Sequence, residues 1–367
     1  MKIKGIDVYA YDLTYAHGEY VMSGGRAAQA QSSTLVRVQT DAGVTGWGEA
    51  CPLGGTYLPA FPAGIRASLQ EMLPYLIGED PTRITALHEI MDGVLLGQEA
   101  AKSPIDIACW DILGKVAGLP VAALIGGRTQ ESFPLYEAVP LTSPEEMAAF
   151  CLLRREAGIS RFQLKVGNDP HEDAARTRAV VEAMGGEAFI VADSNGGWNL
   201  RQAVVAVREL AGLDVIVEQP CRDLADCALV QQMSTLPLSL DECVTGVNEL
   251  YRAKFEAGAV ALNIKIGRLG GISGAVRIRD LATELGMIFT IEDVWGGDVT
   301  SAAVAQVAGS ARPDSLMHAS FFNDWTNEHV AGYAPRSVQG RGRVPDGPGL
   351  GIEVDEAALG APIFSVR

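Results

Sequence analysis

Six charged side chains each close a short apolar run in the second half of the sequence, and their types suggest acid–base chemistry around a metal ion. They are Lys165, Asp193, Glu218, Asp241, Lys265 and Asp293. Successive positions lie 23 to 28 residues apart, a spacing that fits one strand plus one helix. In a parallel α/β barrel, all six would therefore project from the carboxyl ends of the strands, where barrel enzymes keep their active sites.

The three consecutive carboxylates predict a divalent cation. Asp193, Glu218 and Asp241 would repel one another strongly if their strands brought them together in a water-poor site. Ligation by oxygen alone favours Mg²⁺, with Mn²⁺ as a substitute, over zinc, whose sites usually include His or Cys. A helix N-cap is the alternative role for any one of them. Three carboxylates at one βα period, flanked by two lysines, favour the metal.

Lys165 and Lys265 flank the carboxylates and are the candidate acid and base. The pKa of an unperturbed lysine is about 10.4, but a metal cation and a second ammonium nearby lower it toward neutrality. Such a lysine can remove a proton beside a carboxylate while the metal takes up the charge of the enediolate. A structural ion pair of Lys265 with Asp241 or Asp293 is the alternative. It leaves unexplained why both lysines lie on one rim.

Short β-branched runs alternate with amphipathic helices over residues 131–332, and this pattern predicts the barrel that positions these residues. The apolar runs cover residues 162–165, 189–193, 215–218, 238–241, 262–265, 289–293 and 316–319. Helices are expected between them, for example over residues 199–211, 223–233 and 272–285. Seven or eight buried parallel strands at this spacing predict a closed α/β barrel.

Residues 1–130 predict a separate α+β domain. Strands are expected over residues 1–13, 34–40 and 44–50, the last two as a hairpin, and helices over 62–76, 83–91 and 99–117. Gly118-Leu119-Pro120 ends the last helix. Residues 333–367 are rich in Gly, Pro and Arg, and we expect this segment to run back over the first domain.

The composition narrows the class of function. Lys and Arg number 29 against 45 Asp and Glu, and the net charge of -16 disfavours nucleic acid and anionic membranes as partners. The six cysteines are scattered without a C-x-x-C pair, which is typical of reduced thiols in a cytoplasmic protein. No signal peptide, long apolar run, phosphate-binding loop or nucleophile elbow is apparent. The sequence therefore predicts a cytoplasmic enzyme with a small-molecule carboxylate substrate.

The motifs around these residues resemble the muconate-lactonising branch of the enolase superfamily. They are Gln163-Leu-Lys165, Asp193-Ser-Asn195, Glu218-Gln-Pro220, Asp241-Glu242 and Asn263-Ile-Lys265, and the likeness extends to residues 46–50 and 103–115. It implies a modified TIM barrel, (β/α)7β, with an N-terminal α+β capping domain. It also implies that Asp193, Glu218 and Asp241 ligate Mg²⁺. Lys165 and Lys265 would be the acid/base pair on opposite faces of the substrate, as in other lysine-based sites of that superfamily.

One position departs from that pattern, because the family usually has K-x-K where this chain has Gln163-Leu-Lys165. The second position is the catalytic one, so Lys165 keeps its implied role. Gln163 together with the segment Asp293–Asp298 resembles the proline-betaine and hydroxyproline-betaine epimerases. Residues 55–57 and 102–106 resemble the cis-3-hydroxyproline dehydratases.

The leading expectation is a Mg²⁺-dependent racemase or epimerase of a proline betaine-like amino-acid derivative. A cis-3-hydroxy-L-proline dehydratase is the alternative. A muconate-type cycloisomerase is a second alternative, for which only Arg26 and Arg268 could hold the second carboxylate. A non-catalytic metal-binding barrel would differ from all three, because it would exchange no substrate proton. Resemblance to the family also implies a homo-oligomer.

Substrate contacts are expected from the barrel rim and from the capping loops over residues 15–30 and 51–60. The candidates are Tyr57, Gln163, Asp293, Trp295, Gly296 and Phe321. Tyr57, Trp295, Phe321 and Trp325 could form an aromatic cage for a quaternary ammonium, and ordinary packing is the alternative for each. His318 could serve as an acid, although a structural histidine is the commoner role.

Overall fold

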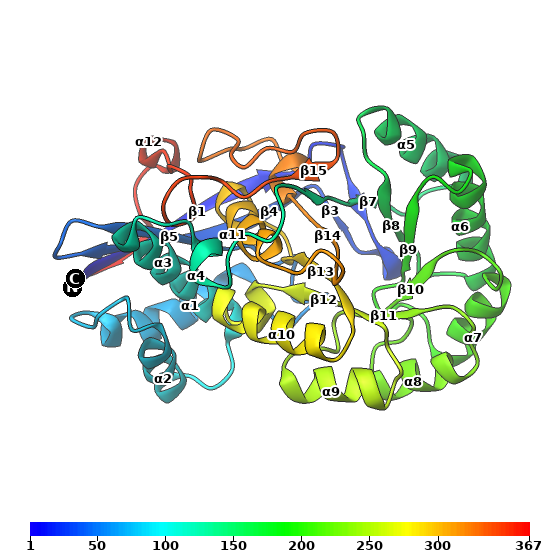
Figure 1. Cartoon of the computed structure of the whole chain (residues 1–367), viewed down its shortest axis with the longest axis horizontal. Coiled ribbons are helices and arrows are strands. Elements are labelled where there is room, and N and C mark those ends of the chain that lie inside the picture. The colour runs from blue at the N-terminus through cyan, green and yellow to red at the C-terminus, as the bar shows by residue number, and fades with distance from the viewer.

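Strand and helix alternate without interruption from Glu137 to Ala319, and this region forms the barrel (Figure 1). In the computed structural model, which describes residues 1–367, eight parallel strands lie in the sheet in the order of the sequence. They are β7 (Glu137–Val139), β8 (Arg161–Lys165), β9 (Phe189–Asp193), β10 (Ile216–Glu218), β11 (Leu238–Leu240), β12 (Ala261–Lys265), β13 (Ile288–Glu292) and β14 (Leu316–Ala319).

Seven helices connect these eight strands, one after each of the first seven. They are α5 (Pro144–Glu156), α6 (Pro170–Met184), α7 (Leu200–Glu209), α8 (Leu224–Gln232), α9 (Val247–Phe255), α10 (Ile272–Glu284) and α11 (Asp298–Gly309). A parallel bridge between Leu135 and Ala319 joins the two ends of the sheet. There the Tyr136 N–H donates to the Ala319 carbonyl at 3.0 Å. The expected (β/α)7β barrel is thus confirmed.

Each expected barrel strand lies within one residue of an observed one, but the first strand, β7, was not anticipated from the sequence. It is three residues long and is followed directly by Pro140, which cannot donate a ladder hydrogen bond. Its apolar run is therefore too short to stand out as a periodic pattern. Asp293 lies just beyond β13, and the strand itself ends at Glu292.

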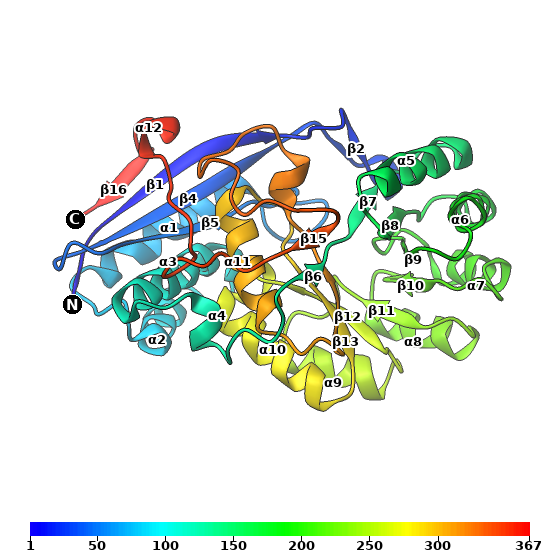
Figure 2. The ribbon, with the colours of Figure 1, turned by 45° about the horizontal axis from the view of Figure 1, so that its top comes forward.

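The capping domain is built on an antiparallel sheet in the order β16-β1-β4-β5. Its strands are β1 (Ile3–Thr14), β4 (Ala30–Thr40), β5 (Thr45–Ala50) and β16 (Phe364–Val366), so the C-terminal strand lies beside the N-terminal one (Figure 2). Helices α1 (Pro62–Met72), α2 (Ile84–Val94), α3 (Glu99–Ala117) and α4 (Val121–Leu124) complete the domain. The expected helix over 62–76 ends in a 3₁₀ turn over Leu73–Leu76.

The strand β5 packs unusually close to helix α3, and two glycines permit it. A Cβ atom on Gly48 would lie 1.9 Å from the Pro104 carbonyl oxygen, and one on Gly46 would lie 2.1 Å from that of Ala108. The sheet and its helices enclose a hydrophobic core of their own, separate from the core around the barrel. The glycines of residues 46–50 therefore fix how closely sheet and helix approach.

Shorter elements complete the structure. The strands are β2 (Tyr20–Val21), β3 (Ala27–Ala28), β6 (Phe133–Pro134) and β15 (Arg341–Gly342), and the last helix is α12 (Glu356–Leu359). The 3₁₀ turns lie at Ser23–Gly25, Gly267–Leu269 and Phe322–Trp325. No helix combines the length and the apolar character that crossing a bilayer requires.

Candidate active site

Lys165 lies at the carboxyl end of β8, buried and flanked by one charged and one neutral partner. Its Nζ lies 2.5 Å from Asp193 Oδ2 on the next strand and donates to Gln163 Oε1 at 2.8 Å. Gln163 and Lys165 are two residues apart, so both side chains face the barrel interior. The strand alternation therefore places Gln163 directly against Lys165.

Lys265 occupies the corresponding place at the end of β12, and its surroundings are more acidic. Its Nζ lies 2.6 Å from Glu292 Oε1 and 3.2 Å from Asp241 Oδ2. The Tyr136 hydroxyl donates to the other Glu292 oxygen, and Asn263 Nδ2 donates to Glu292 Oε1 at 3.0 Å. Lys265 therefore contacts two carboxylates where Lys165 contacts one.

The central carboxylate, Glu218, lies between the two lysine groups on β10. Its Oε1 accepts hydrogen bonds from Gln163 Nε2 at 2.9 Å and from Asn263 Nδ2 at 2.8 Å. Burial, together with the charges of Asp193 and Asp241, raises the pKa of Glu218 well above its usual value. Burial also acts on Asp241, but Lys265 and Arg268 outweigh it and lower the pKa of that carboxyl.

Two of the three carboxylates form ion pairs with basic side chains. No group of three Asp, Glu, His or Cys side chains is arranged to hold a metal ion as the side chains stand. Instead Asp193 pairs with Lys165, and Asp241 pairs with Lys265 and with Arg268, whose Nη1 lies 2.5 Å from Asp241 Oδ1. Glu218 has no basic partner and contacts only the side-chain amides of Gln163 and Asn263.

The donor set nevertheless fits Mg²⁺ in its chemistry. Asp193, Glu218 and Asp241 offer only oxygen atoms, are at most 1% exposed and follow one another on three adjacent strands. Asp193 and Glu218 are direct neighbours in the sheet register. Three buried carboxylates at this spacing require a positive charge, and a divalent cation is the compact form of it.

The pKa values of both lysines respond to the carboxylates beside them. Burial alone would lower the pKa of Lys165, but the charge of Asp193 outweighs it and raises that pKa well above the usual value. Burial opposes the charges of Asp241 and Glu292 at Lys265 in the same way, and its pKa is raised too. A metal cation held by these carboxylates would offset their charge, so the expected lowering of the lysine pKa values stays a prediction.

A cavity of about 20 Å³ separates the two lysines, room for a single water-sized group. Its lining residues are Tyr20, Met22, Leu53, Tyr57, Tyr136, Gln163, Lys165, Lys265, Glu292, Val294, Trp295 and Phe322. Tyr20 and Met22 come from the expected loop over residues 15–30, and Leu53 and Tyr57 from that over 51–60. A substrate larger than water therefore requires these loops or the facing side chains to move.

Three of the expected substrate contacts line this cavity: Tyr57, Gln163 and Trp295. The Tyr57 hydroxyl donates to Asp241 Oδ2 at 3.0 Å, and burial with the charge of Asp241 raises the pKa of Tyr57, so the hydroxyl stays protonated. The ring of Trp295 packs against Tyr20 at 5.2 Å and Phe322 at 5.4 Å between ring centroids. The cavity wall is therefore largely aromatic.

Phe321 is not brought to the cavity. It is 1% exposed and packs edge-on against Phe133 at 5.9 Å in the barrel core, while its neighbour Phe322 lines the cavity. The sequence could not decide between the two, because a 3₁₀ turn begins at Phe322 and breaks the strand alternation. Trp325 packs behind the wall, against Trp295 and Phe322.

Asp293 and Gly296 also lie outside the cavity lining. Asp293 accepts hydrogen bonds from the Gly267 and Val294 N–H groups at 3.0 and 2.7 Å, and burial raises its pKa to about 7. Gly296 serves backbone geometry, because its φ is 159° and a Cβ there would lie 2.3 Å from Thr300. Both residues shape the loop that carries Trp295.

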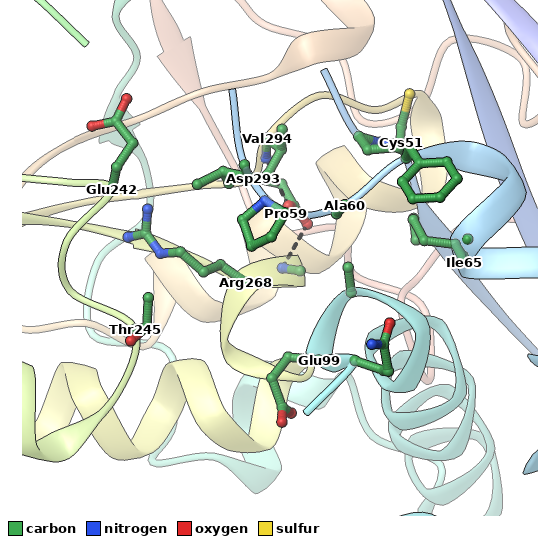
Figure 3. Close-up of a pocket in the computed structure, with 18 residues that line it drawn as sticks. Cys51, Pro59, Ala60, Ile65, Glu99, Glu242, Thr245, Arg268, Asp293 and Val294 are labelled. Carbon is green, nitrogen blue, oxygen red and sulfur yellow. Dashed lines mark hydrogen bonds between the residues drawn. The ribbon is translucent and has the colours of Figure 1, made fainter. Parts of the chain in front are cut away.

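Asp293 faces a second, larger cavity of about 340 Å³ between the capping domain and the barrel (Figure 3). Asp293 lies beside Pro59 there, with Arg268 and Glu242 together beyond it. Val294 lines both cavities, so the loop over residues 51–61 and Val294 separate them. The larger cavity contains neither lysine.

His318 is excluded as an acid at neutral pH. It is 1% exposed and packs between Tyr136 and Phe189, at 4.7 and 5.8 Å between ring centroids. Burial, together with the charge of Arg161, lowers its pKa to about 3. The imidazole is therefore neutral, and it does not line the cavity.

Sequence reasoning missed several residues of the site. They are Tyr20, Met22, Leu53, Tyr136, Asn263, Glu292 and Phe322. Strand alternation could have found two of them, since Asn263 lies two residues before Lys265 and Glu292 ends β13. Tyr136 precedes the short strand β7 and carried no such signal.

Comparison with known proteins places both halves of the chain. The model of the mandelate racemase/muconate lactonizing enzyme N-terminal domain matches residues 6–126, and that of the enolase C-terminal domain-like family matches residues 146–358. A cis-3-hydroxy-L-proline dehydratase from Roseibium aggregatum is 40% identical over 363 residues, covering 99% of both chains. An N-succinyl-L-Arg/Lys racemase from Bacillus cereus is 33% identical over 98% of this chain and 97% of its own.

Solved structures show the same likeness over the whole length. A mandelate racemase/muconate lactonizing enzyme structure from Roseovarius nubinhibens ISM, in complex with magnesium, superposes with a TM-score of 0.96 at 32% identity and covers 100% of both chains. A structural neighbour of this fold thus carries magnesium.

Proposed function

This chain belongs to the mandelate racemase/muconate lactonizing enzyme family of the enolase superfamily, and on that premise we propose that it removes the α-proton of a proline-type carboxylate between Lys165 and Lys265. Enzymes of this superfamily share the fold and the use of Mg²⁺ and differ in substrate and reaction.

One observation carries the proposal: both ammonium groups line one cavity, from strands on opposite sides of three carboxylates. Lys165 lies on β8 and Lys265 on β12, and the strands β9, β10 and β11 lie between them in the sheet. Two proton-transfer groups that face a single position can reach opposite faces of a substrate held there.

Asp193, Glu218 and Asp241 would hold Mg²⁺, with Mn²⁺ as a possible substitute, and bound Mg²⁺ would supply a Lewis acid for the substrate carboxylate. Lys165 and Lys265 would move the protons. Gln163 would orient Lys165 through the 2.8 Å contact with its Nζ, and Glu292 would orient Lys265 at 2.6 Å. Tyr57 would hold Asp241 in place.

We place dehydration of cis-3-hydroxy-L-proline first among the possible reactions. The 40% identical relative over 99% of both chains carries that activity in its name. In that reaction the Cα–H bond breaks, its electron pair forms a Cα=Cβ bond, and the Cβ hydroxyl leaves as water with a proton from the enzyme. The unequal surroundings of Lys165 and Lys265 suit two different tasks better than two identical ones.

Epimerisation at Cα is the second candidate. The aromatic wall of Tyr20, Tyr57, Tyr136 and Trp295 would suit a quaternary ammonium through cation–π attraction. The 33% identical racemase shows that relatives at this distance include 1,1-proton transfer enzymes. A muconate-type cycloisomerase has less support, because no arginine lines the cavity to bind a second carboxylate.

The test is proton NMR of the enzyme in D₂O with Mg²⁺ and four substrates offered separately. These are cis-3-hydroxy-L-proline, L-proline, L-proline betaine and 4-hydroxyproline betaine. A pyrroline product from the first would establish dehydration. Loss of the α-proton signal with growth of the opposite configuration at Cα would establish epimerisation.

Lys165→Met and Lys265→Met serve as matched controls, since methionine approximates the lysine chain without its charge. Turnover that persists in both variants would refute the assigned roles. No proton exchange in any of the four compounds would refute the proline-type substrate. The homo-oligomer and the cytoplasmic location stay predictions.

A further inference from the structure

Glu49 is a carboxylate of the capping domain that accepts hydrogen bonds from four donors at the junction with the barrel. Its Oε1 accepts from the Tyr11 hydroxyl at 2.6 Å, the Ser33 hydroxyl at 2.7 Å and the Gly297 N–H at 2.9 Å. Its Oε2 accepts from the Thr300 N–H at 2.9 Å. An ionised carboxylate has about four acceptor positions, so none is left over.

Two of these donors are backbone N–H groups at the start of helix α11. Gly297 is the N-cap residue of that helix, and no side chain of its own segment caps it. Glu49, which is 0% exposed, therefore caps a barrel helix from the other domain. A Cβ on Gly297 would lie 2.4 Å from the Tyr11 hydroxyl and 3.3 Å from Glu49 Oε1, so glycine permits this approach.

The segment that Glu49 holds is the loop between β13 and α11, which carries Trp295. Trp295 lines the cavity with Lys165 and Lys265, and its side chain packs against Tyr20. Its indole Nε1 is buried and has no hydrogen-bond partner in the protein. A buried N–H without a partner is costly unless something else accepts from it.

We propose that Glu49 is a positioning residue that sets the place of Trp295 in the site, and that the indole N–H of Trp295 contacts the substrate. The inference rests on the proposed function. Glu49 itself does not line the cavity, and it acts through the Gly297 and Thr300 N–H groups. The capping domain thereby reaches the substrate through a barrel loop as well as through its own loops.

A double-mutant cycle in the Mg²⁺-loaded enzyme tests this inference, with Glu49→Gln, Trp295→Phe and the double variant. Glutamine has one acceptor oxygen, so either orientation of its amide leaves the Gly297 or the Thr300 N–H unpaired. Each single variant should raise KM roughly tenfold with little change in kcat, and the double variant should be no worse than Trp295→Phe. Effects that multiply in the double variant, or an unchanged KM in Glu49→Gln, would overturn the inference.

Asp111→Asn is the matched control, because Asp111 is a buried carboxylate that also joins segments by accepting backbone N–H groups. It accepts from Trp47 at 3.0 Å and from Leu350 at 2.9 Å, away from the loop that carries Trp295. Asp111→Asn should lower Tm without changing KM. A KM rise of the same size in this control would show that Glu49 acts only through stability.

A second variant keeps the test decisive if Glu49→Gln does not fold. Tyr11→Phe removes one hydroxyl that anchors Glu49 and leaves the carboxylate in place. It should raise KM about two- to threefold, and that rise should vanish in the Trp295→Phe background. If the wild-type enzyme turns over none of the proline-type compounds, the proposed function fails first. If it is active and the cycle is additive, only the role of Glu49 fails.

Discussion

The two ends of the barrel interior are formed by the same strands, but one end is apolar and the other carries buried charged side chains. At the amino end, Val191, Ile216, Ala261 and Met317 form a small apolar cluster. At the carboxyl end, two to four residues further along three of those strands, the buried side chains are Asp193, Glu218 and Lys265. The apolar cluster at the amino end, the floor, stabilises the fold by removing apolar area from water. The buried charges at the rim are tolerated because ion pairs or side-chain amides contact each of them.

Within a single strand, the residues at the amino end therefore serve stability and those at the carboxyl end serve the chemistry. Ile216 and Glu218 are two residues apart on β10, and both are buried. Substitutions at the floor should therefore change the free energy of unfolding, and substitutions at the rim should change turnover. Four measurements test whether the floor and the rim can be altered independently.

Removal of a rim ammonium should have the largest effect. Lys165→Met and Lys265→Met should each lower kcat/KM by about 10²- to 10⁴-fold, because each removes a proton-transfer group. Circular dichroism should show an unchanged fold. A loss below about tenfold in both variants would place the chemistry elsewhere.

At the floor, Ile216→Ala should lower the free energy of unfolding by about 2–5 kcal/mol, because it leaves a cavity between β9 and β12. Denaturant unfolding measures this change. The variant's kcat/KM should stay within about threefold of wild type at a temperature where it is folded. A hundredfold loss of kcat/KM in folded protein would mean that floor and rim are not separable.

Mg²⁺ should stabilise the folded protein through the rim. At a concentration one hundred times its Kd, a ligand specific for the folded state adds about 2.7 kcal/mol to the free energy of unfolding. Glu218→Gln should lose most of this gain in thermal unfolding with and without Mg²⁺, and Asp111→Asn should keep it. Equal gains in both variants would remove Glu218 from the metal site.

The pH dependence of stability should reveal His318, a histidine buried among aromatic rings without a carboxylate partner. The pKa of His318 is lowered to about 3, against about 6.5 in the unfolded chain. Below pH 6.5 the unfolded chain binds a proton that the folded chain does not. The free energy of unfolding should therefore decrease as the pH is lowered below 6.5. His318 contributes up to about 1.4 kcal/mol of this decrease per pH unit.

Unfolding of His318→Gln at pH 7.5, 6.5 and 5.5 checks this prediction. The variant should lose part of the slope below pH 6.5, whereas His171→Gln, at an exposed histidine, should keep it. Identical slopes in wild type and His318→Gln would contradict the prediction.

The fold was largely predictable because its signals are periodic. Apolar runs such as 189–193 and 262–265 recur at the spacing of one strand and one helix, and the observed strands fall on them. The strand β7 was missed because three residues before a proline leave no period to detect. The helix over 99–117 has the predicted bounds, because Gly118 adopts the left-handed conformation that ends it.

Only the site residues that lie at strand ends could be predicted from the sequence. Lys165, Asp193, Glu218, Asp241 and Lys265 come together at one rim, as their spacing predicts. The pairing of Asp193 with Lys165 and of Asp241 with Arg268 was not predictable, because it depends on side-chain rotamers. The pairing of Lys265 with Asp241 had been the structural alternative for that lysine. Whether Phe321 or Phe322 lines the cavity depends on a local turn that no sequence pattern predicts.

The central claim is that Lys165 and Lys265 face one substrate position from opposite sides, one as the base and the other as the acid. Its most direct test is α-proton exchange in D₂O, with Mg²⁺, of the substrate that the wild type turns over, in Lys165→Met and in Lys265→Met. We predict that one variant loses exchange of the α-proton and that the other retains exchange without forming product. Retention of exchange in both variants, or its loss in both, would contradict the assignment of one lysine to each task.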